Sequence, residues 1–304
     1  MTAASGNGAD LGLPMVVAPT RSARGSRPHK ALGLASAGRL TYLVLGIVTF
    51  ASVFPLYWTI VMASHTNHEM GKSPPAFLPS RSIFHNFTLA TKQAALLKSI
   101  VNTVIVAGTI TIGTVLFCTL AGFAFAKLRF RGQGLLFAIV IGTLAVPTQL
   151  GIIPLFIAMA KLHWVNHLQA VIFPTLVSAF GVFFMRQYLV NAMPTELLEA
   201  GWVDGASTLR IFRSVVLPIA RPAMAVLGML TFLAAWNDFF WPIVALTSRN
   251  PTVQVALASM QSSYVPQTSI IMAGTILGTL PILVVFLFLG RQIVSGIMQG
   301  AVKG

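Results

Sequence analysis

The chain has 304 residues, of which 56% are hydrophobic and only 9% are charged. A soluble domain carries about 25% charged residues, so this composition argues against a soluble enzyme, a disordered chain and a nucleic-acid-binding domain. The formal net charge of +14 comes from basic residues between long apolar runs, and the single cysteine, Cys118, excludes a disulfide framework or a multi-cysteine metal site.

The chain begins with a polar, basic segment. Residues 1–38 are rich in Ala, Gly, Ser and Pro and lack an apolar period, so we expect a disordered cytoplasmic tail. Residues 39–304 are expected to form one transmembrane domain. The first apolar run, Leu40 to Ser64, is too long for the core of a signal peptide and contains Pro55, which favours a retained spanning helix.

Six apolar runs are long enough to cross a membrane, since a spanning helix needs about 20 mostly apolar residues. They predict an all-α membrane protein with six transmembrane helices, at about residues 40–64, 102–126, 134–160, 167–188, 223–246 and 269–293. The polar stretch NPTVQVALASMQSSYVPQTS before the last span is expected to be a loop. Gly274 and Gly278 form a GxxxG motif in the last span, which favours close helix packing.

The positions of the basic residues predict the orientation of the spans. If the N-terminus lies inside the cell, most Lys and Arg residues lie on the cytoplasmic side, among them Arg27, Arg129 and Arg213. Cytoplasmic loops of membrane proteins carry an excess of Lys and Arg. We therefore expect both termini to lie in the cytoplasm.

The loop between the fourth and fifth spans, residues 187–222, carries more predicted structure than a connector needs. Glu196 and Glu199 suit the first turn of a helix, where the helix dipole favours negative charge. Gly205 follows as a left-handed helix terminator, and Ser207 follows as the cap of a second helix. The sequence thus predicts a cytoplasmic helix–turn–helix, which is either a docking element or an ordinary solvated loop. The loop is expected to end at Leu217, Pro218 and Pro222.

This loop resembles the EAA loop of ABC-importer permeases. The family usually has Ala where this chain has Gly201. The residues that carry the resemblance are Glu199, Ala200, Gly201, Asp204, Gly205, Ala206, Leu217, Pro218 and Pro222. Further stretches resemble carbohydrate-importer permeases, above all the smaller permease of maltose-type systems: VPTQLGIIPLF, Trp236-Asn237-Asp238, and the C-terminal Gly300, Ala301, Val302, Lys303 and Gly304. The resemblance covers about residues 38–304.

The resemblance implies a non-catalytic, pore-forming subunit of an ATP-driven sugar importer in the bacterial cytoplasmic membrane. Such a permease pairs with a second permease, binds two ATPase subunits and receives sugar from an extracytoplasmic binding protein. ATP and Mg²⁺ then belong to the ATPase subunits, and no cofactor is expected on this chain. The EAA-loop residues are expected to couple hydrolysis to transport, and the C-terminal residues 300–304 to contact the ATPase interface.

Two residues outside the loop are candidates for the pathway or its gate. Asp238 is the only acid inside an apolar run, and an intramembrane charge is a functional-site hypothesis by default. We expect it near the outer interface, beside Trp236 and Trp241, which suit an aromatic belt. It is interpreted as a structural or gate-adjacent acid, a pathway residue or a direct sugar contact. Asn237 is expected to bridge helices.

Neither a catalytic residue nor a metal site is predicted. No span carries a cluster of His, Asp and Glu that could act together as acid, base and nucleophile. The longest outer loop, residues 65–98, is expected to contact the binding protein or to cap the partner permease. Two alternatives stay open: a permease for peptides, polyamines or phosphate, and an ion-coupled secondary transporter. The sequence does not name the sugar.

Overall fold

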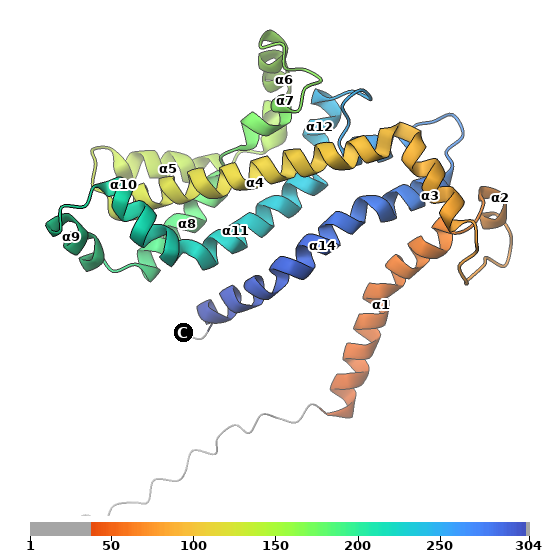
Figure 1. The fold of residues 1–304 in the computed structure, drawn as a ribbon, viewed down its shortest axis with the longest axis horizontal. Coiled ribbons are helices and arrows are strands. Elements are labelled where there is room, and N and C mark those ends of the chain that lie inside the picture. The colour runs from red at the N-terminus through yellow and green to blue at the C-terminus, as the bar shows by residue number, and fades with distance from the viewer. Residues whose placement is uncertain (1–37, 302–304) are drawn as a thin grey trace, which may run out of the picture. The chain divides into compact units, whose positions relative to one another are not determined.

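The computed structural model describes the backbone of residues 38–301 and, apart from Ala94 and residues 289–301, their side chains. Within this range every regular element is a helix, which confirms the predicted all-α class (Figure 1). The expected tail over residues 1–37 and the contact expected for residues 302–304 lie outside the described residues.

The chain divides into two compact units, Met1–Ala51 and Ser52–Gly304. The boundary falls inside α1, Arg39–Ala63, which is apolar along its length and confirms the first predicted apolar helix. The described residues of the first unit, 38–51, are all exposed. The helix packing discussed below belongs to the second unit.

Among the described residues, five helical stretches are long and apolar enough to cross a membrane. They are Arg39–Ala63, Leu96–Lys127 (α4), Gln169–Ala192, Thr208–Asn237, and Thr268–Phe288 within α14, which itself runs Thr268–Ala301. A sixth candidate is a bent pair of helices. The second and sixth predicted spans are thus found as continuous helices, while the three between them differ from the prediction.

The predicted third span, residues 134–160, is not one helix. It consists of α5, Gln133–Thr143, and of a 3₁₀ turn, Thr148–Gly151 (η2), continued by α6, Ile152–Lys161, with a bend of 93° between the two parts. Pro147 lies in the break with an extended ψ of 124°. A proline lacks the N–H that a helix needs and disfavours helical backbone in the residue before it. The third predicted span is therefore present as two helices with a break at Pro147.

The predicted fourth span, residues 167–188, is also interrupted. α7, Gln169–Ile172, and a 3₁₀ turn, Phe173–Thr175 (η3), lead toward α8, Ala179–Ala192, but residues 176–178 are not helical. Ser178 caps α8, because its hydroxyl accepts a hydrogen bond from the Gly181 N–H at 2.9 Å. The helix therefore restarts at a defined residue after the break.

The predicted fifth span, residues 223–246, starts and ends earlier than expected. α10, Thr208–Ile211, a π-helical turn, Phe212–Val216 (η4), and α11, Leu217–Asn237, form one run, and α12, Phe240–Ala245, is separate. The expected loop end at Leu217, Pro218 and Pro222 is therefore wrong. Pro218 has no N–H, so the regular hydrogen-bond pattern of an α-helix is interrupted there. The π-helical turn directly before it, whose hydrogen bonds reach one residue further, accommodates this interruption.

The polar stretch that was expected to be a loop contains a helix, α13, Val253–Gln261. The Val253 N–H donates a hydrogen bond to the Thr103 hydroxyl of α4 at 2.9 Å. A Cβ added at Gly278 of α14 would lie 2.6 Å from Val253 Cγ1, and one at Gly274 would lie 3.1 Å from Leu257 Cδ2. The GxxxG motif therefore serves close packing, as predicted, and its partner is α13.

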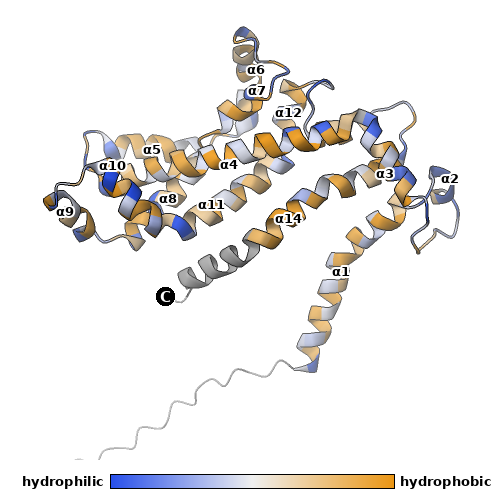
Figure 2. Cartoon of the chain, viewed as in Figure 1, coloured by the Kyte–Doolittle hydropathy of each residue, from blue (hydrophilic) through white to orange (hydrophobic). Residues whose placement is uncertain are grey.

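Helix α4 lies at the centre of this packing and contacts both α8 and α11. One buried cluster joins α4, α8, α9 (Glu196–Val203) and the run from α10 to α11. A second joins the start of α4 to α3 (Ile83–Lys92), α13 and α14, and a third joins α4 to α6, α7 and α12. Figure 2 shows hydrophobic residues along α1, α4, α11 and α14, and hydrophilic residues gathered at α10 and at α2 (Asn67–Met70).

The crossing of α4 and α8 depends on a residue without a side chain. A Cβ added at Gly122 would lie 2.7 Å from Met185 Cβ and 2.8 Å from the Arg186 backbone nitrogen. Small residues let the backbones of membrane helices approach closely. Close approach at Gly122 therefore fixes α8 against α4, next to the segment that leads to α9.

Candidate functional site

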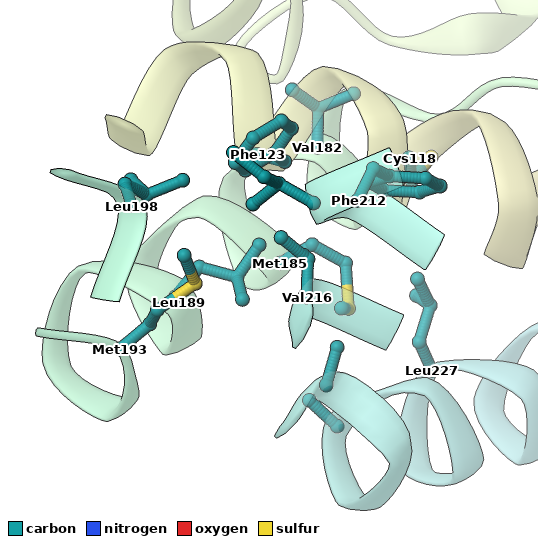
Figure 3. Packing of buried hydrophobic residues seen from close by; sticks show 13 residues of the cluster. Cys118, Phe123, Val182, Met185, Leu189, Met193, Leu198, Phe212, Val216 and Leu227 are labelled. Atoms are coloured by element: carbon teal, nitrogen blue, oxygen red, sulfur yellow. The ribbon is translucent and has the colours of Figure 1, made fainter. Parts of the chain in front are cut away.

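Helix α9 presents one face to the protein core and another to the outside. Glu196 and Glu199 lie in its first turn, where their charges favour the helix dipole. Leu198 is 0% exposed and packs with Leu189 and Met193 of the adjoining segment (Figure 3). Phe123, Ile211 and Phe212 belong to the same cluster. The helix is therefore anchored by Leu198.

The opposite face of α9 is open. Glu199, Ala200 and Val203 point away from Leu198 and are exposed, Val203 at 87%. Trp202 follows Leu198 by four residues, so it lies on the Leu198 side of the helix, where it is 44% exposed. Leu209, which follows in α10, is 55% exposed. Acidic, small and apolar side chains thus occur together on a surface that nothing in the described part of the chain covers.

The turn after α9 has a defined geometry. The Ala206 N–H donates to the Gly201 carbonyl at 2.9 Å, and the Gly205 N–H donates to the Trp202 carbonyl at 3.0 Å. Gly205 has φ +74°, as predicted for a left-handed terminator. These two hydrogen bonds and the left-handed glycine together form a complete Schellman motif, in which Asp204 is the C-cap residue of α9. The direction in which the chain leaves α9 is therefore fixed.

Gly201 sets the distance between α9 and α10. A Cβ added there would lie 3.0 Å from Ile211 Cδ1 and 3.1 Å from Ile211 Cγ1. ABC-importer permeases, which this loop resembles, usually carry Ala at this position. An Ala in place of Gly201 would require Ile211 to move by a few tenths of an ångström. Ser207 then caps the second helix, as predicted, because its hydroxyl accepts a hydrogen bond from the Arg210 N–H at 3.3 Å. The structure brings Glu199, Ala200, Gly201, Asp204, Gly205 and Ala206 together in one helix and its turn.

Leu217 and Pro218 do not belong to this turn. They begin α11, beyond the π-helical turn, with Leu217 half-buried against the core and Pro218 exposed. Gly300 and Ala301 are the last described residues of α14. The EAA-loop residues are thus divided between a surface helix with its turn and the start of a long helix.

The triplet Trp236-Asn237-Asp238 lies at the end of α11. The burial and hydrogen-bond partners of two of its side chains differ from those predicted. Trp236 and Trp241 are buried, and their indole N–H groups donate to the carbonyls of Gly278 at 3.2 Å and Ala170 at 3.0 Å. They tie helices together and do not form an aromatic belt. Asn237 is exposed and donates to the Leu233 carbonyl of its own helix at 2.9 Å, so the expectation that it bridges helices is wrong.

Asp238 is half-buried, and it lies just before α12, close to the backbone N–H groups of Phe240 and Trp241. The same residue lines a cavity of about 610 Å³. Its polar and aromatic lining residues are Thr114, Thr175, Ser178, Phe180, Thr231 and Asp238. Sequence reasoning missed this cavity, because its residues come from three separate segments.

The segment between α1 and α4 contains α2, α3 and a 3₁₀ turn, Gln93–Ala95 (η1). Glu69 accepts a hydrogen bond from the Thr66 N–H at 2.9 Å, and hydrogen bonds from Thr66 hold the pKa of the Glu69 carboxyl below its ordinary value. Asn86 is buried and donates to the carbonyls of Ala63 and His65. The segment is therefore ordered by polar contacts. The described residues hold no group of three or more His, Cys, Asp or Glu that could bind a metal ion.

Known proteins share both the sequence and the fold. The sequence profile of the family described as "Binding-protein-dependent transport system inner membrane component" matches residues 118–299. The arabinooligosaccharides transport system permease protein AraQ of Halalkalibacterium halodurans is 33% identical, over 84% of this chain and 93% of its own. The lactose transport system permease protein LacG of Rhizobium radiobacter is 33% identical, over 86% of this chain and 95% of its own.

A third relative and a solved structure extend the comparison. The sn-glycerol-3-phosphate transport system permease protein UgpE of Salmonella typhi is 30% identical, over 85% of this chain and 94% of its own. A chain from the crystal structure of a bacterial ABC transporter involved in the import of the acidic polysaccharide alginate has the same fold, with a TM-score of 0.72 and 21% identity over 83% of this chain and 94% of that chain. With a family profile over most of its length and relatives along nearly all of it, the chain belongs to the inner membrane components of binding-protein-dependent transport systems.

Proposed function

We propose that the chain is the pore-forming permease subunit of an ATP-driven importer for a sugar, and that α9 and its turn couple it to ATPase subunits. The relatives are named for the transport of arabinooligosaccharides, lactose and sn-glycerol-3-phosphate, which supports a sugar or a sugar-like polyol. The family consists of multi-pass cytoplasmic-membrane transport components and not of enzymes. ATP and Mg²⁺ are therefore assigned to the partner ATPase subunits.

The observation that carries the coupling role is the open face of α9. A helix held by Leu198 on one side and exposed on the other suits insertion into a groove of a partner. Ala200 permits close approach, Val203 supplies apolar area, and Glu199 is placed to pair with a basic residue of the partner. Gly201, Asp204, Gly205 and Ala206 act indirectly, because they set the direction of the turn.

We further assign six spans, with the bent pair of α5 and α6 as the third, and both termini in the cytoplasm. Basic residues at the α9 end of the second unit support this orientation. They are Lys127, Arg129, Arg131, Arg210 and Arg213. In this topology residues 1–38 are a cytoplasmic tail, residues 39–304 are the permease domain, and α9 faces the cytoplasm.

The partners follow from this assignment. They are a second permease subunit, two ATPase subunits and an extracytoplasmic sugar-binding protein, with lipid around the spans. Residues 65–98 and 247–268 are assigned to the outer side, where the binding protein docks. Leu217 and Pro218 support the coupling helix from the start of α11, and the C-terminal Gly300, Ala301, Val302, Lys303 and Gly304 are assigned to the ATPase interface.

A pull-down of the tagged chain with its ATPase subunit tests the coupling role. Ala200→Arg places a bulky charge on the open face, and Ala76→Arg, on the exposed outer segment, is the matched control. We expect Ala200→Arg to reduce recovery of the ATPase subunit at least about tenfold, which corresponds to about 1.4 kcal/mol. Ala76→Arg should retain wild-type recovery. Equal recovery with Ala200→Arg, at equal abundance in the membrane, would contradict docking at α9.

A further inference from the structure

The cavity that Asp238 lines is separate from the coupling helix and has the size of a ligand site. Its volume is about 610 Å³, and small-molecule sites in proteins commonly enclose about 300–1,000 Å³. Its walls come from α4, from residues 175–180, which run from the end of η3 into the start of α8, and from α11 with Asp238 at its end. The proposed coupling role uses none of the residues that line it.

The cavity borders an interrupted candidate span. Residues 176–178 break the helical stretch Gln169–Ala192, and Thr175, just before the break, and Ser178, at its end, line the cavity. Inside a membrane, irregular backbone is tolerated only where protein buries it or where it lines a cavity. The carbonyls of Thr175 and Ser178 accept hydrogen bonds from Thr114 Oγ1 at 3.3 Å and Cys118 Sγ at 3.5 Å, so α4 holds the break in place.

Two polar side chains of the cavity retain capacity to bind a ligand. The Thr231 hydroxyl has no hydrogen-bond partner within the described part of the chain. The Asp238 carboxylate lies near two backbone N–H groups, and a carboxylate offers about four acceptor positions, so positions remain for a ligand. A ligand hydroxyl can therefore donate to Asp238, and Thr231 can donate to or accept from another hydroxyl.

An aromatic ring supplies an apolar surface in the same cavity. Phe180 is 45% exposed and stacks on Phe184 with 5.9 Å between ring centroids. The face of an aromatic ring carries partial negative charge, which favours the C–H groups of a sugar ring against it. Hydroxyl-binding groups and an aromatic face within one cavity are the combination that a sugar ring needs.

The charge of the cavity favours the binding of neutral ligands over that of anions. Asp238 is the charged residue among the described residues that line it, and neither Lys nor Arg lines it. An anionic ligand would face a carboxylate without a compensating cation, whereas the hydroxyls of a neutral ligand are attracted to it. We infer that this chain itself contributes a subsite for a neutral sugar ring, with Thr231, Asp238 and Phe180 as its contacts. The inference rests on the proposed function.

Uptake by cells that carry the complete importer tests the subsite, with radiolabelled lactose, arabinotriose and sn-glycerol 3-phosphate as probes. Thr231→Val removes the free hydroxyl with little change of shape. Thr111→Val is the matched control, because the Thr111 hydroxyl is also without a partner but lies outside the cavity. We expect Thr231→Val to raise the KM of the transported sugar about threefold to tenfold, the effect of one lost hydrogen bond. Thr111→Val should leave the KM unchanged.

A second readout measures occupancy without transport. In a Thr231→Cys variant, a maleimide should label the new thiol while the buried native Cys118 stays unlabelled. The transported sugar should slow this labelling at least about twofold, since a bound ligand excludes the reagent. Labelling that the sugar does not slow, together with an unchanged KM in Thr231→Val and Phe180→Leu, would overturn the subsite while sugar import stands.

The remaining outcomes distinguish the two proposals. Preference of the wild-type importer for sn-glycerol 3-phosphate over both sugars would overturn the neutral-ligand inference and leave ATP-driven import intact. Uptake of none of the probes would overturn the sugar assignment and the subsite together. Retention of the ATPase subunit by Thr231→Val, checked by pull-down, ensures that a raised KM reports the cavity and not the coupling helix.

Discussion

The left-handed turn at Gly205 gives a prediction that depends on backbone conformation alone. Gly205 has φ +74°, and a Cβ added there would meet nothing within 4 Å. A substitution therefore introduces no clash, and its effect comes from the preference of side-chain-bearing residues for negative φ. The left-handed conformation costs an ordinary residue about 1–2 kcal/mol and a β-branched residue more, while Asn tolerates it better.

A series of substitutions at Gly205 should reduce function in proportion to how strongly each residue disfavours a positive φ. We expect Asn to be the mildest change, Ala intermediate and Val the most severe. A loss of about 1–2 kcal/mol shifts the equilibrium between the native and a displaced turn by a factor of about 5 to 30. Sugar uptake and recovery of the ATPase subunit should fall in that order, and hydrogen exchange at the Gly205 and Ala206 amides should rise in the same order.

Gly132 provides the matched control for this series. It has φ +81°, it also has open space around the added Cβ, and it lies between α4 and α5, outside the coupling helix. Gly132→Val should therefore carry a similar backbone strain without affecting recovery of the ATPase subunit. Wild-type uptake and exchange in Gly205→Val would refute the reasoning about the turn, and equal loss of ATPase recovery in Gly132→Val would show a general folding defect.

Two further predictions concern packing around the site. Gly122→Ala should lower the thermal unfolding temperature of the solubilised protein, because an overpacked site commonly costs about 1–3 kcal/mol, whereas Gly108→Ala on the same helix, with open space around the added Cβ, should not. Leu198→Ala should weaken the anchoring of α9 by about 2–5 kcal/mol, as for other fully buried leucines, and reduce ATPase recovery. The 43% exposed Leu197, changed to Ala, should have a much smaller effect on stability; equal effects of the two leucine variants would contradict the burial of Leu198.

The parts of the fold that were predicted correctly depend on local signals. Gly205 after Asp204, Ser207 before α10, and the long charge-free runs of α1, α4 and α14 each act within a few residues, so one sequence reveals them. The 93° bend at Pro147 was missed because a proline marks a possible break but does not fix its angle. α13 was missed because the Thr103 contact that fixes its start comes from a distant helix.

The candidate sites show the same limit. The turn after α9, for which we propose a coupling role, is contiguous in sequence, and its residues were identified from their order. The cavity is assembled from α4, the break before α8 and the end of α11, and none of its hydroxyls stands out in its own segment. Trp236 and Trp241 were interpreted as interfacial because tryptophans often are, whereas Gly278 and Ala170 supply acceptors that only the folded chain brings close.

The π-helical turn at Phe212–Val216 also determines which side of α11 faces inward. Such a turn accommodates one residue more than an α-helical turn, and each residue of an α-helix advances the side-chain direction by about 100°. Without the extra residue, every position downstream would be rotated by that angle, and the stripe that carries Leu227, Thr231 and Ala234 would no longer point at the cavity. The five residues Phe212–Val216 thus set the direction in which the side chains at the far end of α11, next to Asp238, point.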